Sequence, residues 1–169
     1  MEYNPRIHHR HSIRLVGYNY SHEGYYFITI CTHEKRALFG TIENNQMIQN
    51  KTGRMIQSFW NEMPKYYSGI KIDAFQVMPN HVHGIIVIVG AGPCACPNKL
   101  SLGDIVGRFK SITANKYVRD IKQIKFKEKL WQRNYYERII RNEQALMNTR
   151  EYIIKNPCNW DKDELFMEL

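Results

Sequence analysis

The sequence contains no apolar run long enough to cross a membrane. Its longest such stretch, residues 84–92 (GIIVIVGAG), has the length of a β-strand, whereas a membrane-spanning helix needs about 20 apolar residues. Residues 1–14 (MEYNPRIHHRHSIR) also lack the apolar segment of a secretory signal peptide. We therefore expect a cytoplasmic protein with no membrane partner.

Cysteine is scarce and poorly spaced for a structural metal centre. The four cysteines are Cys31, Cys94, Cys96 and Cys158. Only Cys94 and Cys96 lie close together, and no second pair follows at the spacing of a zinc site. In a reducing compartment all four are expected to be free thiols.

Internal repeats and low-complexity segments are also missing. The chain has 169 residues, 43% of them hydrophobic, which is enough to fill one hydrophobic core. A chain of this length is more often one domain than two. We therefore expect one domain over residues 1–169, with a basic N-terminal arm over about residues 1–20. The segment from about residue 160 to residue 169 is expected to be a short irregular tail.

Acidic residues are sparse between residues 110 and 133. This segment holds eight basic residues and two acidic ones, so it carries +6 of the net charge of +8. Clustered positive charge favours a polyphosphate partner, because each neutralised phosphate releases counterions. A solvated helix face followed by a lysine-rich loop would give the same pattern. The residues that we expect to contact DNA are Arg10 and Arg14 in the N-terminal arm, Lys110 and Lys116 on a helix, and Arg133 and Arg138 near the last strand.

The remaining pattern alternates strand and helix signals. Strands are expected over residues 24–32, 70–78, 81–89 and 130–140, and two short strands around the turn at Asn44 and Asn45. Helices are expected from a cap at Asn50 to about residue 66, over residues 102–119 after a cap at Ser101, and over residues 143–155 after a cap at Asn142. The order βββ-α-ββ-α-β-α predicts an α+β fold, in which helices cover an antiparallel sheet.

Two histidines stand one residue apart where the most apolar strand begins, in PNHVHGIIVI. Residues i and i+2 of a strand point to the same face, so His81 and His83 are expected to present their imidazoles side by side. Such a pair is half of a metal site. A pair of surface or core histidines without a metal is the plainer alternative.

The last expected helix, in REYIIKNP, offers groups that would complete such a site. Tyr152 and Asn156 are four residues apart and therefore lie one turn apart on the same face. Imidazole nitrogens and an amide oxygen suit Mg²⁺ or Mn²⁺. A metal that offsets charge on a phosphodiester would let a tyrosine attack phosphorus and form a covalent link.

Other tyrosines compete for the role of nucleophile, and Tyr135 and Tyr136 are the nearest because basic residues adjoin them. Strand alternation would bury one of these two and expose the other. Neither has a polar partner one helical turn away. They are better candidates for packing or for stacking on unpaired bases.

Four separated motifs, MPNHVHGIIVI, SLGDIVGRFKS, WQRNYYERIIRNE and REYIIKNP, occur in that order. Together they resemble the single-tyrosine HUH transposases (IS200-like), specifically the REP-associated tyrosine transposases. The resemblance runs from about Arg10 to Trp160.

This resemblance implies a ferredoxin-like or RRM-like sheet and a divalent metal held by His81 and His83. It implies that Tyr152 is the nucleophile and that Asn156 takes the polar position that is glutamine in related insertion-sequence transposases. Because asparagine has a shorter reach, whether Asn156 is a direct ligand stays open. The implied reaction is cleavage of single-stranded DNA beside a palindromic hairpin, leaving a 5′-phosphotyrosine and a free 3′-OH. The implied state is a monomer or a homodimer.

Two other functions fit parts of the pattern. A catalytically silent nucleic-acid-binding module with an RRM-like sheet would keep the basic and aromatic residues, but it would not need all four of His81, His83, Tyr152 and Asn156. A replication initiator or relaxase of the HUH superfamily usually has a further domain, against which the short chain argues.

Overall fold

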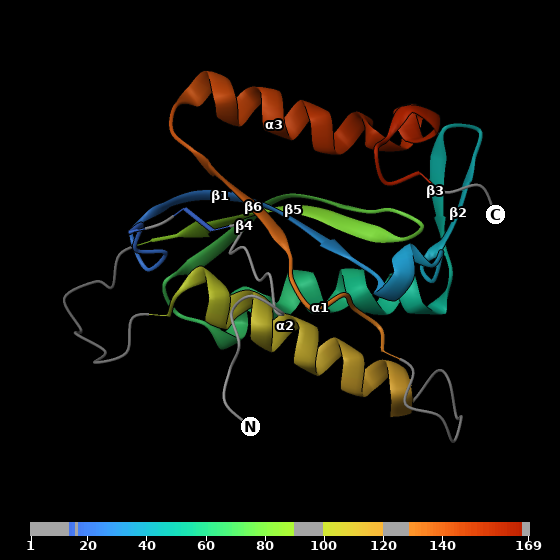
Figure 1. Ribbon diagram of the computed structural model, residues 1–169, viewed down its shortest axis with the longest axis horizontal. Coiled ribbons are helices and arrows are strands. Elements are labelled where there is room, and N and C mark those ends of the chain that lie inside the picture. Colours follow the sequence, from blue (N-terminus) through green and yellow to red (C-terminus); the bar gives the residue numbers. More distant parts are fainter. Residues whose placement is uncertain (1–13, 16, 90–99, 120–128, 167–169) are drawn as a thin grey trace, which may run out of the picture.

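A computed structural model describes residues 14, 15, 17–89, 100–119 and 129–166, and Figure 1 shows its elements. The predicted arm residue Arg10 and the cysteines Cys94 and Cys96 lie outside the described residues. The elements are β1 (Gly24–Cys31), the 3₁₀ turn η1 (His33–Lys35), β2 (Gly40–Glu43), β3 (Gln46–Gln49), α1 (Lys51–Tyr66), β4 (Ile70–Val77), β5 (His81–Ile88), α2 (Leu102–Tyr117), β6 (Tyr136–Ile140), α3 (Glu143–Lys155) and the 3₁₀ turn η3 (Asn156–Lys162).

The main sheet has four strands in the order β4-β5-β1-β6, and all neighbours are antiparallel. Together with the helices, the order β1-α1-β4-β5-α2-β6 is the βαββαβ arrangement of ferredoxin-like folds. The β2–β3 hairpin forms a separate two-stranded sheet inserted between β1 and α1. The predicted α+β fold, ferredoxin-like with an antiparallel sheet, is confirmed.

The sheet lies between two helical layers. Helices α1 and α2 cover one face, and α3 crosses the other (Figure 1). The larger core lies under α1 and α2, and a smaller cluster under α3 includes Ile85, Val87, Leu146 and Ile153. Strand β5 is buried along its whole length because it is central and covered on both faces. This double burial explains its continuous apolar run.

Gly84 sets the contact between β5 and α1. A Cβ atom at this position would lie 2.5 Å from the Trp60 side chain. The Trp60 ring stacks on Phe75, with 4.2 Å between ring centroids. A glycine is therefore required for the helix to approach the strand this closely.

Local hydrogen bonds start the helices where the sequence predicts. The Asn50 side chain accepts from the backbone N–H groups of Thr52 and Gly53 at the start of α1. Ser101 forms a capping box with Asp104 at the start of α2, and Asn142 caps α3. Each cap satisfies N–H groups that would otherwise lack partners.

The hairpin turn between β2 and β3 is also where the sequence predicts it. Asn44 and Asn45 have φ values of 50° and 61°. Two consecutive left-handed residues are typical of a type I′ hairpin turn, and asparagine adopts this conformation more readily than most side chains.

Two segments differ from the sequence-based expectation. The predicted strand over residues 130–140 is shorter, because β6 covers only Tyr136–Ile140 and Trp131 makes an isolated bridge to Thr32. The C-terminal tail continues from α3 into η3, which ends at Lys162, and then folds back on the sheet. There the carbonyl of Leu165 accepts a 2.8 Å hydrogen bond from Asn80 Nδ2. Among the described residues, no helix is both long enough and apolar enough to span a membrane.

Candidate metal and tyrosine site

The imidazoles of His81 and His83 converge on one point at the α3 side of the sheet. Their Nε2 atoms are 3.0 Å apart, and both side chains are buried. The second nitrogen of each ring has its own partner: Nδ1 of His81 lies 2.8 Å from Asn80 Oδ1, and Nδ1 of His83 lies 2.8 Å from Thr29 Oγ1. Such outer partners orient histidine rings that bind metals.

The hydrogen bonds of Asn80 fix which nitrogen of His81 carries the proton. Asn80 Nδ2 donates to the Leu165 carbonyl, so Oδ1 is the atom that faces His81. An amide oxygen only accepts hydrogen bonds, and therefore His81 must donate from Nδ1. Its Nε2 is consequently the unprotonated nitrogen, with its lone pair directed at the convergence point and at His83 Nε2.

Burial keeps both imidazoles neutral. Desolvation, with a smaller contribution from the charge of Lys35, lowers the pKa of His81 to about 3. Desolvation, followed by the neighbouring His81, lowers the pKa of His83 well below its ordinary value. Neutral imidazoles are the form that binds a metal cation.

Helix α3 brings the predicted tyrosine to the same point. Tyr152 Oη lies 3.4 Å from His83 Nε2, and the Tyr152 side chain is 47% exposed. Phe27 of β1 contacts both side chains: its ring centroid lies 5.3 Å from that of His83 and 6.0 Å from that of Tyr152. The phenol is therefore accessible from solvent and held beside the histidine pair.

Asn156 lies at the end of α3, where it is only 2% exposed. Its Nδ2 donates a 2.8 Å hydrogen bond to Asp163 Oδ2. Its Oδ1 is buried and has no hydrogen-bond partner among the described residues. A buried amide oxygen without a partner, on a residue that is hydrogen-bonded to Asp163, is a further candidate ligand for a cation.

Asp163 is a candidate ligand that sequence reasoning missed. Ligand atoms of His81, His83 and Asp163 all lie within 4.8 Å of one another. No periodic spacing relates Asp163 to the helix, because η3 separates them and the chain then turns back. The only signal in the sequence is the acidic run DKDE, which by itself names no ligand. Two imidazoles, a carboxylate and an orphaned amide oxygen are a donor set suited to a divalent cation.

The surroundings of Tyr152 favour the protonated phenol. Burial raises the pKa of Tyr152, and the negative charges of Asp163 and Glu164 raise it further. Asn156 and Arg138 act in the opposite direction and lower that pKa. Without additional positive charge, Tyr152 therefore keeps its proton at neutral pH and is a weak nucleophile.

Tyr135 and Tyr136 alternate as the sequence predicts. Tyr135 is 6% exposed and packs on the α2 side, whereas Tyr136 is 56% exposed. No contact joins either of them to the histidine pair within the described chain. Tyr152 is the tyrosine that reaches His83.

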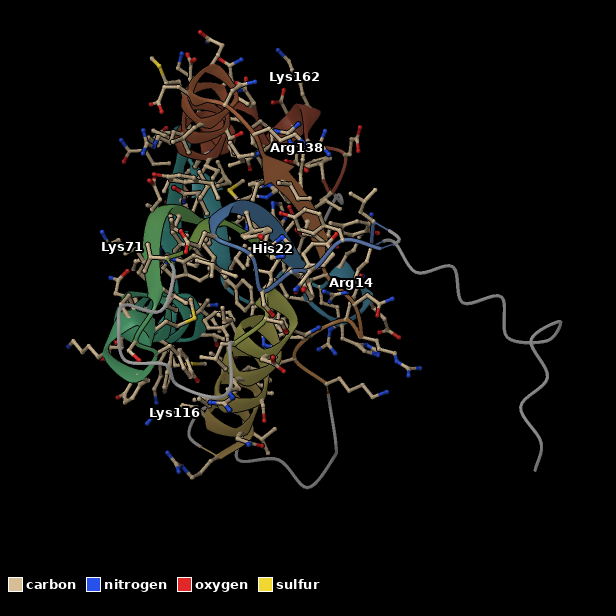
Figure 2. All side chains as sticks on the ribbon, turned by 90° about the vertical axis from the view of Figure 1, so that its left-hand side faces the viewer. Arg14, His22, Lys71, Lys116, Arg138 and Lys162 are labelled. Carbon is tan, nitrogen blue, oxygen red and sulfur yellow. The ribbon has the colours of Figure 1, made fainter. Side chains whose placement is uncertain are left out.

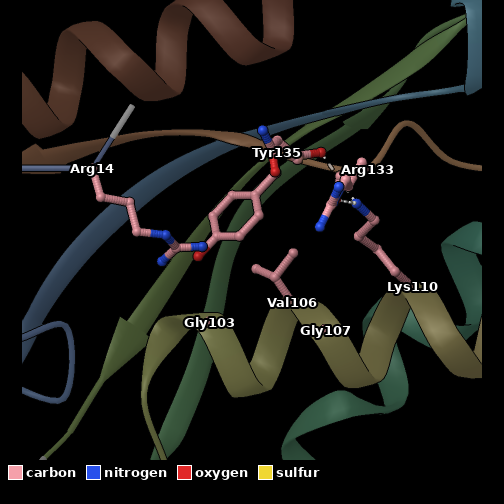
Figure 3. Close-up of a pocket in the computed structure, with 8 residues that line it drawn as sticks. Arg14, Gly103, Val106, Gly107, Lys110, Arg133 and Tyr135 are labelled. Carbon is pink, nitrogen blue, oxygen red and sulfur yellow. Dashed lines mark hydrogen bonds between the residues drawn. The ribbon is translucent and has the colours of Figure 1, made fainter. Parts of the chain in front are cut away.

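Three of the predicted DNA contacts gather around one cavity, shown in Figure 3. Arg14, Lys110 and Arg133 line this space of about 320 Å³, together with Tyr135 and the first turns of α2. The guanidinium carbon of Arg14 lies 4.6 Å from the centroid of the Tyr135 ring. We call this cavity the basic pocket. It lies on the α2 side of the sheet, so it is separate from the histidine pair.

Lys110 supports the wall of the basic pocket. Its ammonium donates to the backbone carbonyls of Gln132, Arg133 and Asn134 over 2.6, 2.9 and 3.1 Å. Burial lowers the pKa of Lys110 to about 8. An ammonium group has three donors, and these three carbonyls occupy them. In this structure Lys110 therefore holds the segment that carries Arg133.

The other two basic candidates do not line the basic pocket, although Arg138 lines a second hollow together with Arg14. Arg138, on β6, is placed beside the tyrosine: its guanidinium lies over Phe27 at 5.7 Å and donates to Thr149 Oγ1. Lys116 is in the last turn of α2, and Figure 2 shows it far from both Arg14 and Arg138. The predicted set therefore divides between the basic pocket, the tyrosine and a remote helix end.

Comparison with known proteins places this geometry in a family. The sequence profile of the family described as "Transposase IS200 like" matches residues 20–156. An uncharacterised protein of Haemophilus influenzae is 42% identical over 181 aligned positions, which cover 99% of this chain and 98% of the relative.

Two solved structures share the fold. One is a REP-associated tyrosine transposase bound to a REP hairpin, with a TM-score of 0.60, 18% identity, and coverage of 86% of this chain and 73% of the other. The second, a Deinococcus radiodurans R1 protein assigned as a transposase, has a TM-score of 0.51, 18% identity, and coverage of 85% and 96%. At this identity the two structures show the fold alone. Because the family profile spans most of the sequence, including the histidine pair and the tyrosine, the chain belongs to the IS200-like transposase family.

Proposed function

We propose that this transposase cleaves and rejoins single-stranded DNA beside hairpin-forming palindromes, with Tyr152 as the nucleophile. The observation that carries the proposal is the approach of Tyr152 Oη to within 3.4 Å of an imidazole in a buried, neutral histidine pair. The structural neighbour bound to a REP hairpin supports hairpin DNA as the substrate class.

A divalent cation, Mg²⁺ or Mn²⁺, would be held by His81, His83 and Asp163. The donor atoms of these three residues are close enough together, and the unpaired Oδ1 of Asn156 is a fourth candidate. Such an ion acts as a Lewis acid that offsets negative charge on the reacting phosphodiester. It would also offset the two carboxylates that raise the pKa of Tyr152.

In the proposed step one phosphodiester bond is exchanged for another, so its energy is kept in the covalent link to Tyr152. The Tyr152 oxygen forms a bond to phosphorus, and the bond from phosphorus to the 3′ oxygen of the preceding nucleotide breaks. The phenol proton is lost to solvent, and the departing 3′ oxygen takes up a proton. The products are a 5′-phosphotyrosine and a free 3′-OH, and attack by another 3′-OH reverses the step and joins different ends.

Basic residues position the strand around this reaction. Arg138 lies next to Tyr152 and lowers its pKa, so it can contact the scissile phosphate or a neighbouring one. Arg14 and Arg133 of the basic pocket are suited to phosphates of the hairpin. The two arginine sites lie on different sides of β6, which suits a DNA that wraps around this edge of the sheet.

We propose that the tyrosine and the histidines of one site come from the same chain. Helix α3 packs on the sheet of its own chain, where Tyr152 contacts His83. This arrangement supports cleavage in cis, by a monomer or by a dimer whose subunits act independently.

A covalent-adduct assay tests the proposed function. Labelled single-stranded oligonucleotides spanning the palindromes beside the gene would be incubated with protein and Mg²⁺, Mn²⁺ or EDTA, and then resolved on a denaturing gel. We expect a metal-dependent protein–DNA band that is lost in Tyr152→Phe. Tyr136→Phe, which changes an exposed tyrosine on the neighbouring strand, is the matched control and should retain the band. Hairpin binding with no adduct in any metal would favour the silent nucleic-acid-binding module.

A further inference from the structure

A groove next to the candidate metal site has no role in the chemistry proposed above. It encloses about 720 Å³ and is lined by residues of η1, of the β2–β3 hairpin and of the C-terminal segment. Figure 1 shows the C-terminal turn beside this hairpin, and a 3.6 Å contact between Cys158 Sγ and the Asn45 carbonyl agrees. We call this space the η1 groove.

The η1 groove shares a wall with the histidine pair. Asn80 lines the groove, and the same side chain is hydrogen-bonded to His81 Nδ1. Trp160 also lines the groove, and its ring centroid lies 5.9 Å from that of His81. A group in the groove would therefore adjoin whatever is bound at the imidazoles.

The lining of the η1 groove combines aromatic rings and aliphatic side chains with charged residues. Trp160 meets Phe166 edge to face, with 5.4 Å between ring centroids. Lys35 and Arg36 supply two positive charges to the same lining and Glu34 supplies one negative charge, so the lining remains net positive. A flat ring beside cations suits a ligand that combines an aromatic plane with an anion, as a nucleotide does.

The backbone that carries these cations is strained. Glu34 and Lys35 are consecutive non-glycine residues with φ values of 58° and 52°. The left-handed conformation is unfavourable for residues that carry a Cβ atom, because that atom approaches the following carbonyl oxygen. Strain of this kind is concentrated at functional sites, where it fixes the direction of side chains.

We propose that the η1 groove holds one unpaired nucleotide of the scissile DNA strand, with its base on Trp160 and a flanking phosphate at Lys35. This inference rests on the proposed function, because it places the nucleotide next to the phosphate that Tyr152 attacks. The volume lies within the range of about 300–1,000 Å³ that is typical of small-ligand sites. The continuity with the histidine pair and the positive charge favour a nucleotide over an apolar peptide.

The test measures binding, so it does not depend on cleavage. All proteins would carry Tyr152→Phe, and each would be titrated against a labelled hairpin oligonucleotide from the palindromes beside the gene, with a single-stranded extension. In a series of oligonucleotides, a single abasic residue would replace each nucleotide of that extension in turn. Stacking of a base on an aromatic side chain contributes about 1–3 kcal/mol, so one abasic position should raise Kd about 5- to 150-fold.

Adding Trp160→Leu should raise Kd for the intact oligonucleotide by a similar factor. In that variant, the same abasic position should cause no further loss, because its base no longer has a platform. Trp160→Phe should retain most of the affinity. The matched control is Tyr66→Leu, which removes an aromatic ring that is 66% exposed at the end of α1; it should leave Kd unchanged.

Lys35→Gln gives a second readout. Loss of one phosphate contact to a single strand should reduce the slope of log Kd against log salt concentration by about 0.7. An unchanged slope, an unchanged Kd in Trp160→Leu, or an abasic penalty of equal size with and without Trp160 would each overturn the proposal. If the Kd pattern holds but the wild-type protein never forms an adduct, the groove proposal stands and the proposed cleavage fails.

Discussion

At the scale of single residues, hydrogen bonds outside the ligand set determine how the imidazoles are presented. Asn80 fixes the proton of His81, and Thr29 holds the ring of His83. The C-terminal segment contributes Asp163, which faces both rings, and the Leu165 carbonyl that fixes Asn80. The candidate ligand set is therefore complete only when the chain beyond α3 folds back over β5.

Substitution of Asp163 tests this contribution. Asp163→Asn removes the carboxylate charge but keeps the shape, so we expect at least about a tenfold loss in affinity for Mn²⁺, the range seen when groups that support a metal are changed. Isothermal titration with Mn²⁺ measures this directly. The control is Asp161→Asn, which changes an exposed carboxylate outside the candidate ligand set. Equal Mn²⁺ affinity in wild type and Asp163→Asn would contradict the assignment.

Sequence reasoning placed pairs of residues on a common face where their spacing is periodic, and it did not anticipate the position of Asp163, whose spacing is not periodic. His81 and His83 follow strand alternation, and Tyr152 and Asn156 follow the helical turn, so each pair could be placed on a common face. That the two pairs meet depends on α3 crossing the sheet, which the spacing alone does not require. Asp163 follows a helix break and a 3₁₀ turn, and its position is set by tertiary contacts that no local pattern encodes.

At the scale of elements, a bulge in β4 anchors the helix that carries the tyrosine. The register of β4 shifts between Ile72 and Phe75, and Asp73 lies within this irregular segment. Its carboxylate accepts two hydrogen bonds from Arg150 of α3, over 2.9 and 2.7 Å. Bulges commonly redirect a side chain in this way. The pair connects β4, an edge strand of the sheet, to the turn of α3 that precedes Tyr152.

This pair predicts a pH dependence of stability. The hydrogen bonds from Arg150 hold the pKa of Asp73 below its ordinary value of 3.8. A carboxyl group whose folded pKa is depressed stabilises the fold above its unfolded pKa, and the stabilisation is lost as pH falls through the folded value. We therefore expect Asp73→Asn to lower the midpoint of urea unfolding slightly at pH 7, and the difference from wild type to be lost as the pH falls below 3.8 and through the lower pKa of the folded state.

Two measurements complete that test. The pair is partly exposed and screened by solvent, so its effect on global stability should be small. Its effect on the rate of adduct formation should be larger, because it positions α3. The account would be contradicted if the urea midpoint of Asp73→Asn stayed below that of wild type by the same amount at acidic pH. It would also be contradicted if Asp73→Asn cleaved DNA at the wild-type rate, because the pair would then not anchor the helix.

The contact between α1 and β5 gives a prediction about packing. Gly84→Ala places a methyl group 2.5 Å from the Trp60 ring, so we expect the free energy of unfolding to fall by about 1–3 kcal/mol. Gly107→Ala is the matched control. A Cβ atom there meets nothing within 4 Å, and replacing glycine within a helix should stabilise by up to about 1 kcal/mol. Urea denaturation distinguishes the two, and equal effects would contradict this account of the α1–β5 packing.

Element boundaries were predictable where a capping side chain determines them. Asn50, Ser101 and Asn142 begin the three helices as expected because their side-chain oxygens accept from the first turn. The start of β6 was not predictable in the same way. The apolar and aromatic residues from Leu130 to Tyr135 resemble a strand, but Lys110 binds the carbonyls of residues 132–134 and diverts them from strand pairing.

At the scale of the whole molecule, the ferredoxin-like sheet separates two candidate sites. The α3 face carries the histidine pair and the tyrosine, and the α2 face carries the basic pocket. The net charge of +8 favours DNA as the partner. Composition and periodicity were sufficient for the fold class, whereas the division of the basic residues between two faces required the three-dimensional arrangement.

The packing of α3 on its own sheet predicts that complementation between subunits fails. His81→Ala and Tyr152→Phe proteins would be mixed in equal amounts and assayed for the covalent adduct. If cleavage occurs in cis, the mixture forms none, because no subunit carries both groups. Recovery of adduct in the mixture would show that Tyr152 acts on the metal site of a partner subunit.

The most direct measurement of the central claim is the mass of the peptide that carries DNA. The reaction mixture with the hairpin oligonucleotide and Mn²⁺ would be digested with nuclease and trypsin, and the peptides would be sequenced by mass spectrometry. Trypsin releases Tyr152 in the short peptide EYIIK, residues 151–155. The account predicts a nucleotide joined through its 5′ phosphate to Tyr152 in this peptide. A nucleotide on any other residue, or linkage through a 3′ phosphate, would contradict it.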